Sequence, residues 1–182
     1  MRRLRQLSLM IVAAALLIVG AQLVACGGGE PGGGEALSLP EYLQRMDAVR
    51  ADMHDRSFAL DERHSEQLEA ASTDEEWLDA YRRGFGERIS VESDHLDDVK
   101  SLDPPAEAEA PHQDYVDALA EGVEFLADFN DRMDGVDSRS EVDDLWDEAG
   151  GDFDEISRRI TDACSALQDL ADEHGIDVNL EC

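Results

Sequence analysis

The chain has little positive charge. Its 182 residues carry 44 Asp and Glu against 15 Lys and Arg, for a formal net charge of -29, and Lys100 is the single lysine. Nucleic-acid binders draw most of their affinity from neutralising phosphates with Lys and Arg, and electrostatic attachment to anionic lipid uses the same side chains. The composition therefore argues against a nucleic-acid binder and against a protein held to a membrane by electrostatics alone.

Motifs of enzymes are also lacking. The sequence has no Gly-rich phosphate loop, no His-Glu-x-x-His pair and no Gly-x-Ser-x-Gly elbow. Among so many carboxylates, the sequence singles out no acid–base pair. We therefore expect a protein that is not an enzyme and has no cofactor. A hydrophobic content of 42% is nevertheless too high for a wholly disordered acidic chain, so a folded core is expected.

The N-terminal residues have the pattern of an export signal. Three arginines within residues 2–5 precede an apolar stretch, Leu7 to Ala25. The alternative is an uncleaved membrane helix, because about 20 apolar residues are enough to span a bilayer. Both interpretations place the acidic remainder of the chain outside the cytoplasm.

The end of this stretch, Leu23-Val24-Ala25-Cys26, resembles the lipobox of bacterial lipoproteins, in which aliphatic and small residues precede an invariant cysteine. The resemblance implies that residues 1–25 are a cleaved signal peptide and that Cys26 carries a diacylglyceryl group. It also implies attachment to a cell-envelope membrane, on the extracytoplasmic face, through that lipid. The resemblance covers the leader alone and implies nothing about the fold behind it.

Residues 26–37 follow as a Gly-rich segment without apolar periodicity, a composition typical of a flexible linker. Removal of residues 1–25 would take away three arginines and no acid, which changes the net charge from -29 to -32. Such a surface is typical of strong solvation. It would also attract cations or a basic protein partner.

From Ser38 onward the chain shows four amphipathic patterns of helical period, and no stretch alternates like a strand. Because the breaks are short, successive helices should be antiparallel neighbours. We therefore predict an all-α fold over residues 38–182, an up-down-up-down four-helix bundle of long helices with a short C-terminal tail. The first and last apolar residues of the four patterns are Leu39 and Leu68, Leu78 and Val99, Tyr115 and Met133, and Val142 and Leu170.

Several residues mark where these helices begin, bend or end. Gly84-Phe85-Gly86 predicts a bend or a close helix crossing, and Pro111 predicts a kink or restart. Gly175 before Ile176 is typical of a left-handed helix cap. Three helix starts carry a Ser or Thr followed three residues later by Glu, the pattern of a capping box: Ser38, Thr73 and Ser138.

Two cysteines remain once Cys26 is assigned to lipid. Cys164 lies near the apolar stripe of the fourth pattern, and Cys182 ends the short tail. Since the expected compartment permits disulfides, we predict a Cys164–Cys182 bridge that folds the tail back along its own helix. The alternative is one buried thiol and one frayed terminal thiol.

A metal site is the main alternative function. Glu92 and His95 have the Glu-x-x-His spacing that ferritin-like bundles use for two ligands on one helical face, but the fourth pattern offers no second copy. Counting residues from the predicted turns places four side chains at similar heights along the bundle axis: His54, Glu92, His95 and His112. Such a set of ligands suits a single Zn, Cu or Ni ion. The competing interpretation is surface histidines in a carboxylate-rich field.

The sequence therefore predicts a lipid-anchored, extracytoplasmic helical bundle that acts as a non-catalytic envelope or binding component. The alternative is an extracytoplasmic metal-binding protein that uses the four residues above.

Overall fold

The computed structural model describes residues 37–182. Within this range the chain is all-helical, with four α-helices and no strand, so the predicted all-α four-helix fold is confirmed. The predicted signal peptide (1–25), the lipobox cysteine and the linker up to residue 36 lie outside the described residues. The described residues belong to one compact unit. None of the helices described is long and apolar enough to cross a membrane.

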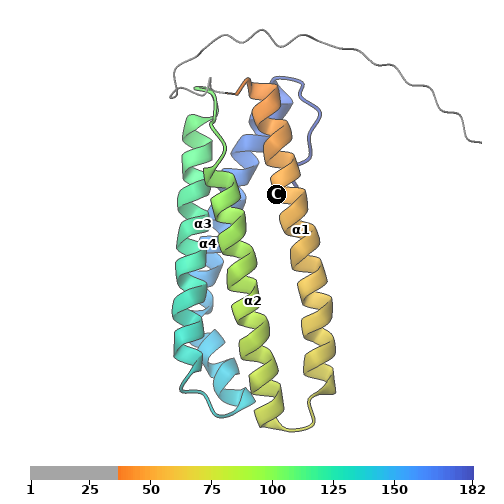
Figure 1. Cartoon of the computed structure of the whole chain (residues 1–182). Helices are drawn as coiled ribbons and strands as arrows, with labels where there is room; N and C mark the ends of the chain where they lie inside the picture. Colours follow the sequence, from red (N-terminus) through yellow and green to blue (C-terminus); the bar gives the residue numbers. More distant parts are fainter. Residues whose placement is uncertain (1–36) are drawn as a thin grey trace, which may run out of the picture. The chain divides into compact units, whose positions relative to one another are not determined.

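The four helices are long and their connections are short (Figure 1). A non-helical tail, residues 174–182, follows the last helix. The helices are α1 (Leu39–Ala70), α2 (Asp74–Lys100), α3 (Glu109–Met133) and α4 (Arg139–Glu173).

The helices pack mainly against their neighbours in the chain. Each helix packs extensively against the next one, whereas α1 and α4 touch at few positions. Exposed ion pairs join two of these interfaces: Arg56–Asp94 and Arg63–Glu87 between α1 and α2, and Arg132–Glu148 and Arg159–Glu121 between α3 and α4. Such pairs add little stability individually, so the apolar core holds the helices together.

Burial along α1 is uneven, and this unevenness shapes the site described below. Its first turns bury Tyr42, Leu43 and Met46 completely. Beyond Met46 the predicted stripe thins, because Met53 is only half-buried and Leu60 is the next residue that is fully inside. The middle of α1 is therefore less closely packed than its beginning.

The residues that mark helix ends and crossings mostly act as predicted. Thr73 Oγ1 accepts from the Glu76 amide at 3.1 Å, which satisfies one of the unpaired amides at the start of α2. A methyl group on Gly84 would lie 2.4 Å from the ring of His64, so the predicted close crossing of α1 and α2 is confirmed. Gly86 faces open space.

The kink predicted at Pro111 is wrong. Residues 102–105 are irregular, residues 106–108 form a turn, and α3 begins only at Glu109. Pro111 therefore lies in the first helical turn, where its missing amide hydrogen breaks no intrahelical bond. The predicted restart is the true start of the helix.

Candidate functional site

The C-terminal tail lies between α1 and α4. Gly175 adopts a left-handed φ of +64°, and the Ile176 amide donates to the carbonyl of Ala171 at 2.9 Å, which turns the chain back after α4. The Leu180 side chain is completely buried in the core. On the α4 side, the Leu180 amide donates to Oε1 of Gln168 at 2.9 Å.

A disulfide ties the end of the tail to α4, because Cys164 and Cys182 are bonded with their Cα atoms 5.6 Å apart. This is the pairing expected from the sequence. The bridge closes a loop with a sequence separation of 18 and keeps Leu180 inserted beside α4. The tail therefore fills one stretch of the seam between two helices that otherwise scarcely touch.

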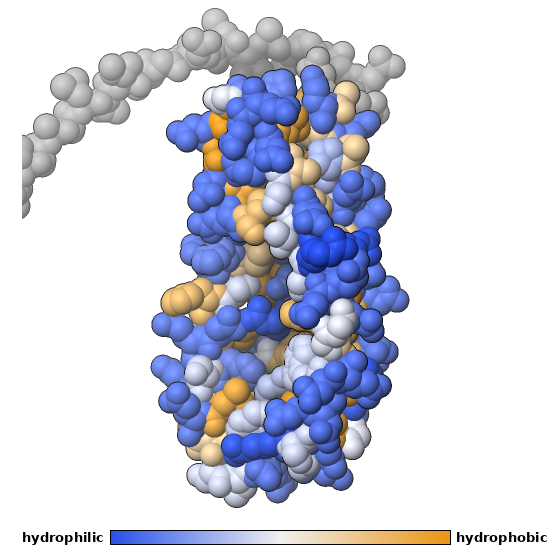
Figure 2. Space-filling model, turned by 180° about the vertical axis from the view of Figure 1, so that it is seen from behind, coloured by the Kyte–Doolittle hydropathy of each residue, from blue (hydrophilic) through white to orange (hydrophobic). Residues whose placement is uncertain are grey.

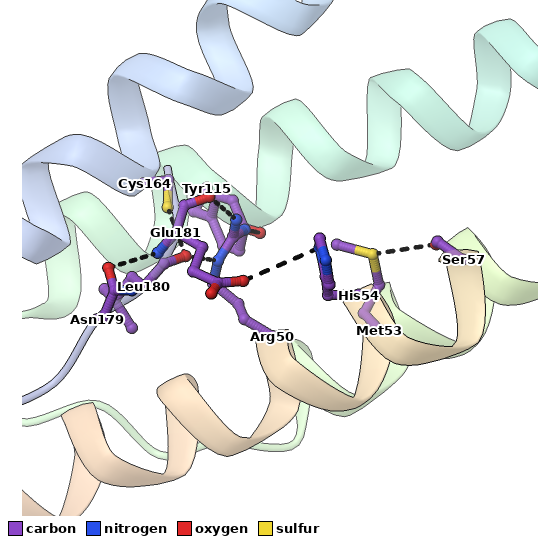
Figure 3. Close-up of polar contacts among 9 residues, drawn as sticks. All are labelled: Arg50, Met53, His54, Ser57, Tyr115, Cys164, Asn179, Leu180 and Glu181. Carbon is purple, nitrogen blue, oxygen red and sulfur yellow. Dashed lines mark hydrogen bonds and ion pairs between the residues drawn. The ribbon is translucent and has the colours of Figure 1, made fainter. Parts of the chain in front are cut away.

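Arg50 of α1 holds the other side of the tail (Figure 3). Its guanidinium donates to the carbonyl oxygens of Leu180 and Glu181, the latter at 3.0 Å, and to the hydroxyl of Tyr115 on α3. The same guanidinium lies 5.6 Å from the centre of the Tyr115 ring. One side chain thus connects α1, α3 and the tail.

The network continues into α2 through His95, whose Nε2 lies 3.1 Å from the Tyr115 hydroxyl. Since Tyr115 accepts a hydrogen bond from Arg50, its own proton is available to Nε2 of a neutral His95. Burial, helped by the charges of Arg50 and Arg56, lowers the pKa of His95 to about 4. His95 is therefore uncharged at neutral pH, and Arg50 carries the charge of this network.

Where the tail ends, the seam continues as an open cleft of about 340 Å³. One side of the cleft is apolar and comes from α3 and α4. Hydrophobic surface lies between hydrophilic margins on the side of the molecule that Figure 2 presents. The main apolar residues of the cleft are Val123, Phe125, Leu126, Phe153, Ile156 and Ile160.

The opposite side of the cleft is charged and comes from α1 and α2. Arg50, Arg88 and Glu92 line it, and Nη1 of Arg88 lies 3.7 Å from a Glu92 carboxylate oxygen. Burial raises the pKa of Glu92, although the neighbouring Arg88 and Arg50 oppose this rise. Two guanidinium groups and one carboxylate therefore line the cleft, and Arg88 also bonds to Asp61 outside it.

The four predicted metal ligands are not brought together. His54 is exposed, with Nδ1 3.9 Å from a Glu181 carboxylate oxygen, whereas Glu92 lines the cleft. His95 is bonded to Tyr115, and Nδ1 of His112 lies 2.9 Å from the hydroxyl of Tyr42. Across residues 37–182, no group of three or more His, Cys, Asp or Glu side chains is arranged to hold a metal ion.

Sequence reasoning missed the residues that form the cleft's charged side. Arg50 follows Val49 of the apolar stripe directly, so its long side chain can enter the bundle while its backbone stays on the edge of the stripe. The place of Arg50 next to the apolar stripe was therefore the feature of the sequence that could have indicated its role. Arg88 has a comparable position, because it directly precedes Ile89, which packs against the core.

Comparison with protein families, with curated proteins and with solved structures gives no match for this chain. The function has to be inferred from the cleft itself and from the leader.

Proposed function

We propose that this protein is a lipid-anchored binding protein of the cell envelope, without catalytic activity, whose helical bundle holds a small apolar or amphiphilic molecule in the cleft between α1 and α4. The cleft is the observation that carries the proposal. Its volume of about 340 Å³ falls in the range of small-molecule sites, which are mostly apolar with a few polar groups.

The architecture that supports this proposal is an antiparallel, up-down-up-down bundle. The falling residue numbers across each ion-paired helix interface support it, as do the short connections between successive helices. In such a bundle α1 and α4 are the outer helices of the chain order, and a ligand can enter between them without breaking contacts between successive helices.

The anchor rests on the resemblance of Leu23-Val24-Ala25-Cys26 to a lipobox. Two or three acyl chains on Cys26 would hold the protein stably, where one chain would not. The Gly-rich residues 26–37 would then separate the bundle from the membrane surface. The Cys164–Cys182 bridge suits an oxidising extracytoplasmic compartment.

Replacing the lipobox cysteine tests the anchor. We expect Cys26→Ser to abolish incorporation of radiolabelled fatty acid and to leave the precursor uncleaved, as seen by gel mobility in a lipoprotein-processing host. Cys164→Ser with Cys182→Ser is the matched control, which should still be labelled and processed. Normal processing of Cys26→Ser would contradict the lipobox assignment.

Filling the cleft tests the binding function. Residues 35–182 should bind the neutral fluorescent probe N-phenyl-1-naphthylamine at one saturable site. Gly122 lines the cleft, and a methyl group there would meet Ile160 at 3.5 Å, so Gly122→Leu should fill the space and abolish binding. Gly86→Leu on an open face of α2 is the matched control. The binding proposal fails if the wild type shows no saturable binding, or if Gly122→Leu binds normally.

A further inference from the structure

The cleft offers two chemically different sides to one ligand. Its α3–α4 side is mainly apolar, although Ser157 and Thr161 also line it, and Phe125 and Phe153 there have ring centroids 5.8 Å apart. Its α1–α2 side presents Arg50, Arg88 and Glu92. A molecule that covers both sides needs an apolar body and a polar or charged head, because an apolar molecule alone would bury guanidinium groups without giving them partners.

The guanidinium of Arg88 has N–H donors that make no hydrogen bond with other described residues. Among the described residues it makes one hydrogen bond, to Asp61 on α1, and an ion pair with Glu92. A guanidinium carries five N–H donors in a planar fork that fits a carboxylate or a phosphate. Arg50 already donates to two tail carbonyls and to Tyr115, so Arg88 is better placed to receive a new acceptor.

The sign of the charge in the cleft favours an anion. Two arginines and one glutamate line it, and burial raises the pKa of Glu92, although Arg88 and Arg50 oppose this rise. The many carboxylates elsewhere on the surface act through water and salt, which screen them beyond about 10 Å at 0.1 M. Asp61 pairs with Arg88 from outside the cleft, so an incoming anion is attracted by Arg50 and by the N–H donors of Arg88 that remain free.

We infer that the cleft binds a single-chain amphiphile with an anionic head group, of the class of long-chain carboxylates. The head group pairs with Arg88, Arg50 adds its positive charge, and the alkyl chain lies along the α3–α4 wall. This inference rests on the proposed binding function and adds the chemical class of the ligand.

Three ten-carbon ligands that differ in head-group charge test the inference. Decanoate, decanol and decyltrimethylammonium, each below its micelle concentration, compete with N-phenyl-1-naphthylamine for residues 35–182. We expect decanoate to displace the probe at a concentration about tenfold or more below the other two, the gain typical of a charge-assisted hydrogen bond. Gly122→Leu should bind none of them.

Variants then identify the head-group partner. Arg88→Gln should remove the preference for decanoate and leave decanol binding unchanged, whereas Arg83→Gln, on an exposed position of the same helix, should leave both unchanged. Asp61→Asn separates a ligand contact from a structural role, because it removes the Arg88–Asp61 pair but keeps the guanidinium. We expect this variant to retain the decanoate preference.

The results of these experiments separate the ligand class, the role of Arg88 and the binding function itself. If decanol or decyltrimethylammonium competes as well as decanoate, the anionic ligand is refuted while the binding function stands. If Arg88→Gln keeps the preference, or Asp61→Asn loses it, the assignment of Arg88 as head-group partner is overturned. If the wild type shows no saturable probe binding at all, the proposed function itself fails.

Discussion

Buried polar residues connect this bundle across four segments. Arg50 reaches the tail and Tyr115, and Tyr115 reaches His95, so side chains of α1, α2 and α3 share one network with the tail backbone. Buried polar groups are costly when they lack partners. Each bond in this network therefore contributes to the geometry of the seam that contains the cleft.

His95 should make the protein sensitive to mild acid. Its pKa is about 4 in the folded chain, below the ordinary value of 6.5, so between these values the unfolded chain takes up a proton that the native state rejects. The associated stability is complete above pH 6.5 and is lost as the pH falls towards 4, at up to about 1.4 kcal/mol per pH unit. We expect urea unfolding at pH 7, 6 and 5 to show this loss.

His95→Gln should reduce that pH dependence, because glutamine does not titrate but can still bond to Tyr115. His174→Gln, at an exposed position after α4, should follow the wild-type profile. Parallel losses of stability for wild type and His95→Gln between pH 7 and 5 would exclude His95 as a cause.

Among the helices, the sequence signals that worked are local ones. Ser38, Thr73 and Ser138 precede α1, α2 and α4 as predicted, because a cap depends only on residues within one turn. Pro111 misled because proline is compatible with both a kink and a first turn, and the choice depends on where the preceding turns end.

The direction of a side chain around its helix was the harder problem. Counting residues from the turns gives the height along the bundle axis of His54, Glu92, His95 and His112. It does not give the direction in which each side chain points, because successive residues of a helix are rotated by about 100° around the helix axis. A small error in the rotation of any helix therefore separates residues of equal height. His54 indeed points outward, whereas His95 is buried.

The tail should lose its place when its bridge is removed. A disulfide that closes a loop of this size contributes about 3 kcal/mol in the chain-entropy model, so Cys164→Ala with Cys182→Ala should lower the free energy of unfolding by about that amount. Urea titration monitored by circular dichroism measures the difference. Thiol counting on denatured residues 35–182 should find no reduced cysteine. Two reduced thiols there would refute the bridge.

For the whole molecule, the four-helix fold was predictable but the cleft was not. Four amphipathic patterns with short breaks leave few alternatives for an all-α fold. The cleft depends instead on the spacing of α1 and α4, which scarcely touch and have Leu180 of the tail buried in the core between them. No periodic pattern predicts that the tail, residues 174–182, will be part of the core.

The net charge of -29 should make folding dependent on salt. Repulsion among carboxylates destabilises the compact state, and salt screens it. We expect the thermal midpoint at pH 7 to rise between 20 mM and 500 mM NaCl. Choline chloride at equal concentration is the control, and should act similarly if screening is the cause. An unchanged or lower midpoint would contradict this account.

The contact between Arg50 and the tail also bears on the order of assembly. Most packing joins helices that follow one another in the chain, so these pairs can form from nearby segments at little cost in loop entropy. The bond from Arg50 to Leu180 joins residues 130 positions apart, and it needs α4 and its disulfide loop in position first. The tail is therefore expected to dock last during folding and to detach first, so the seam between α1 and α4 is completed only after the helices have packed.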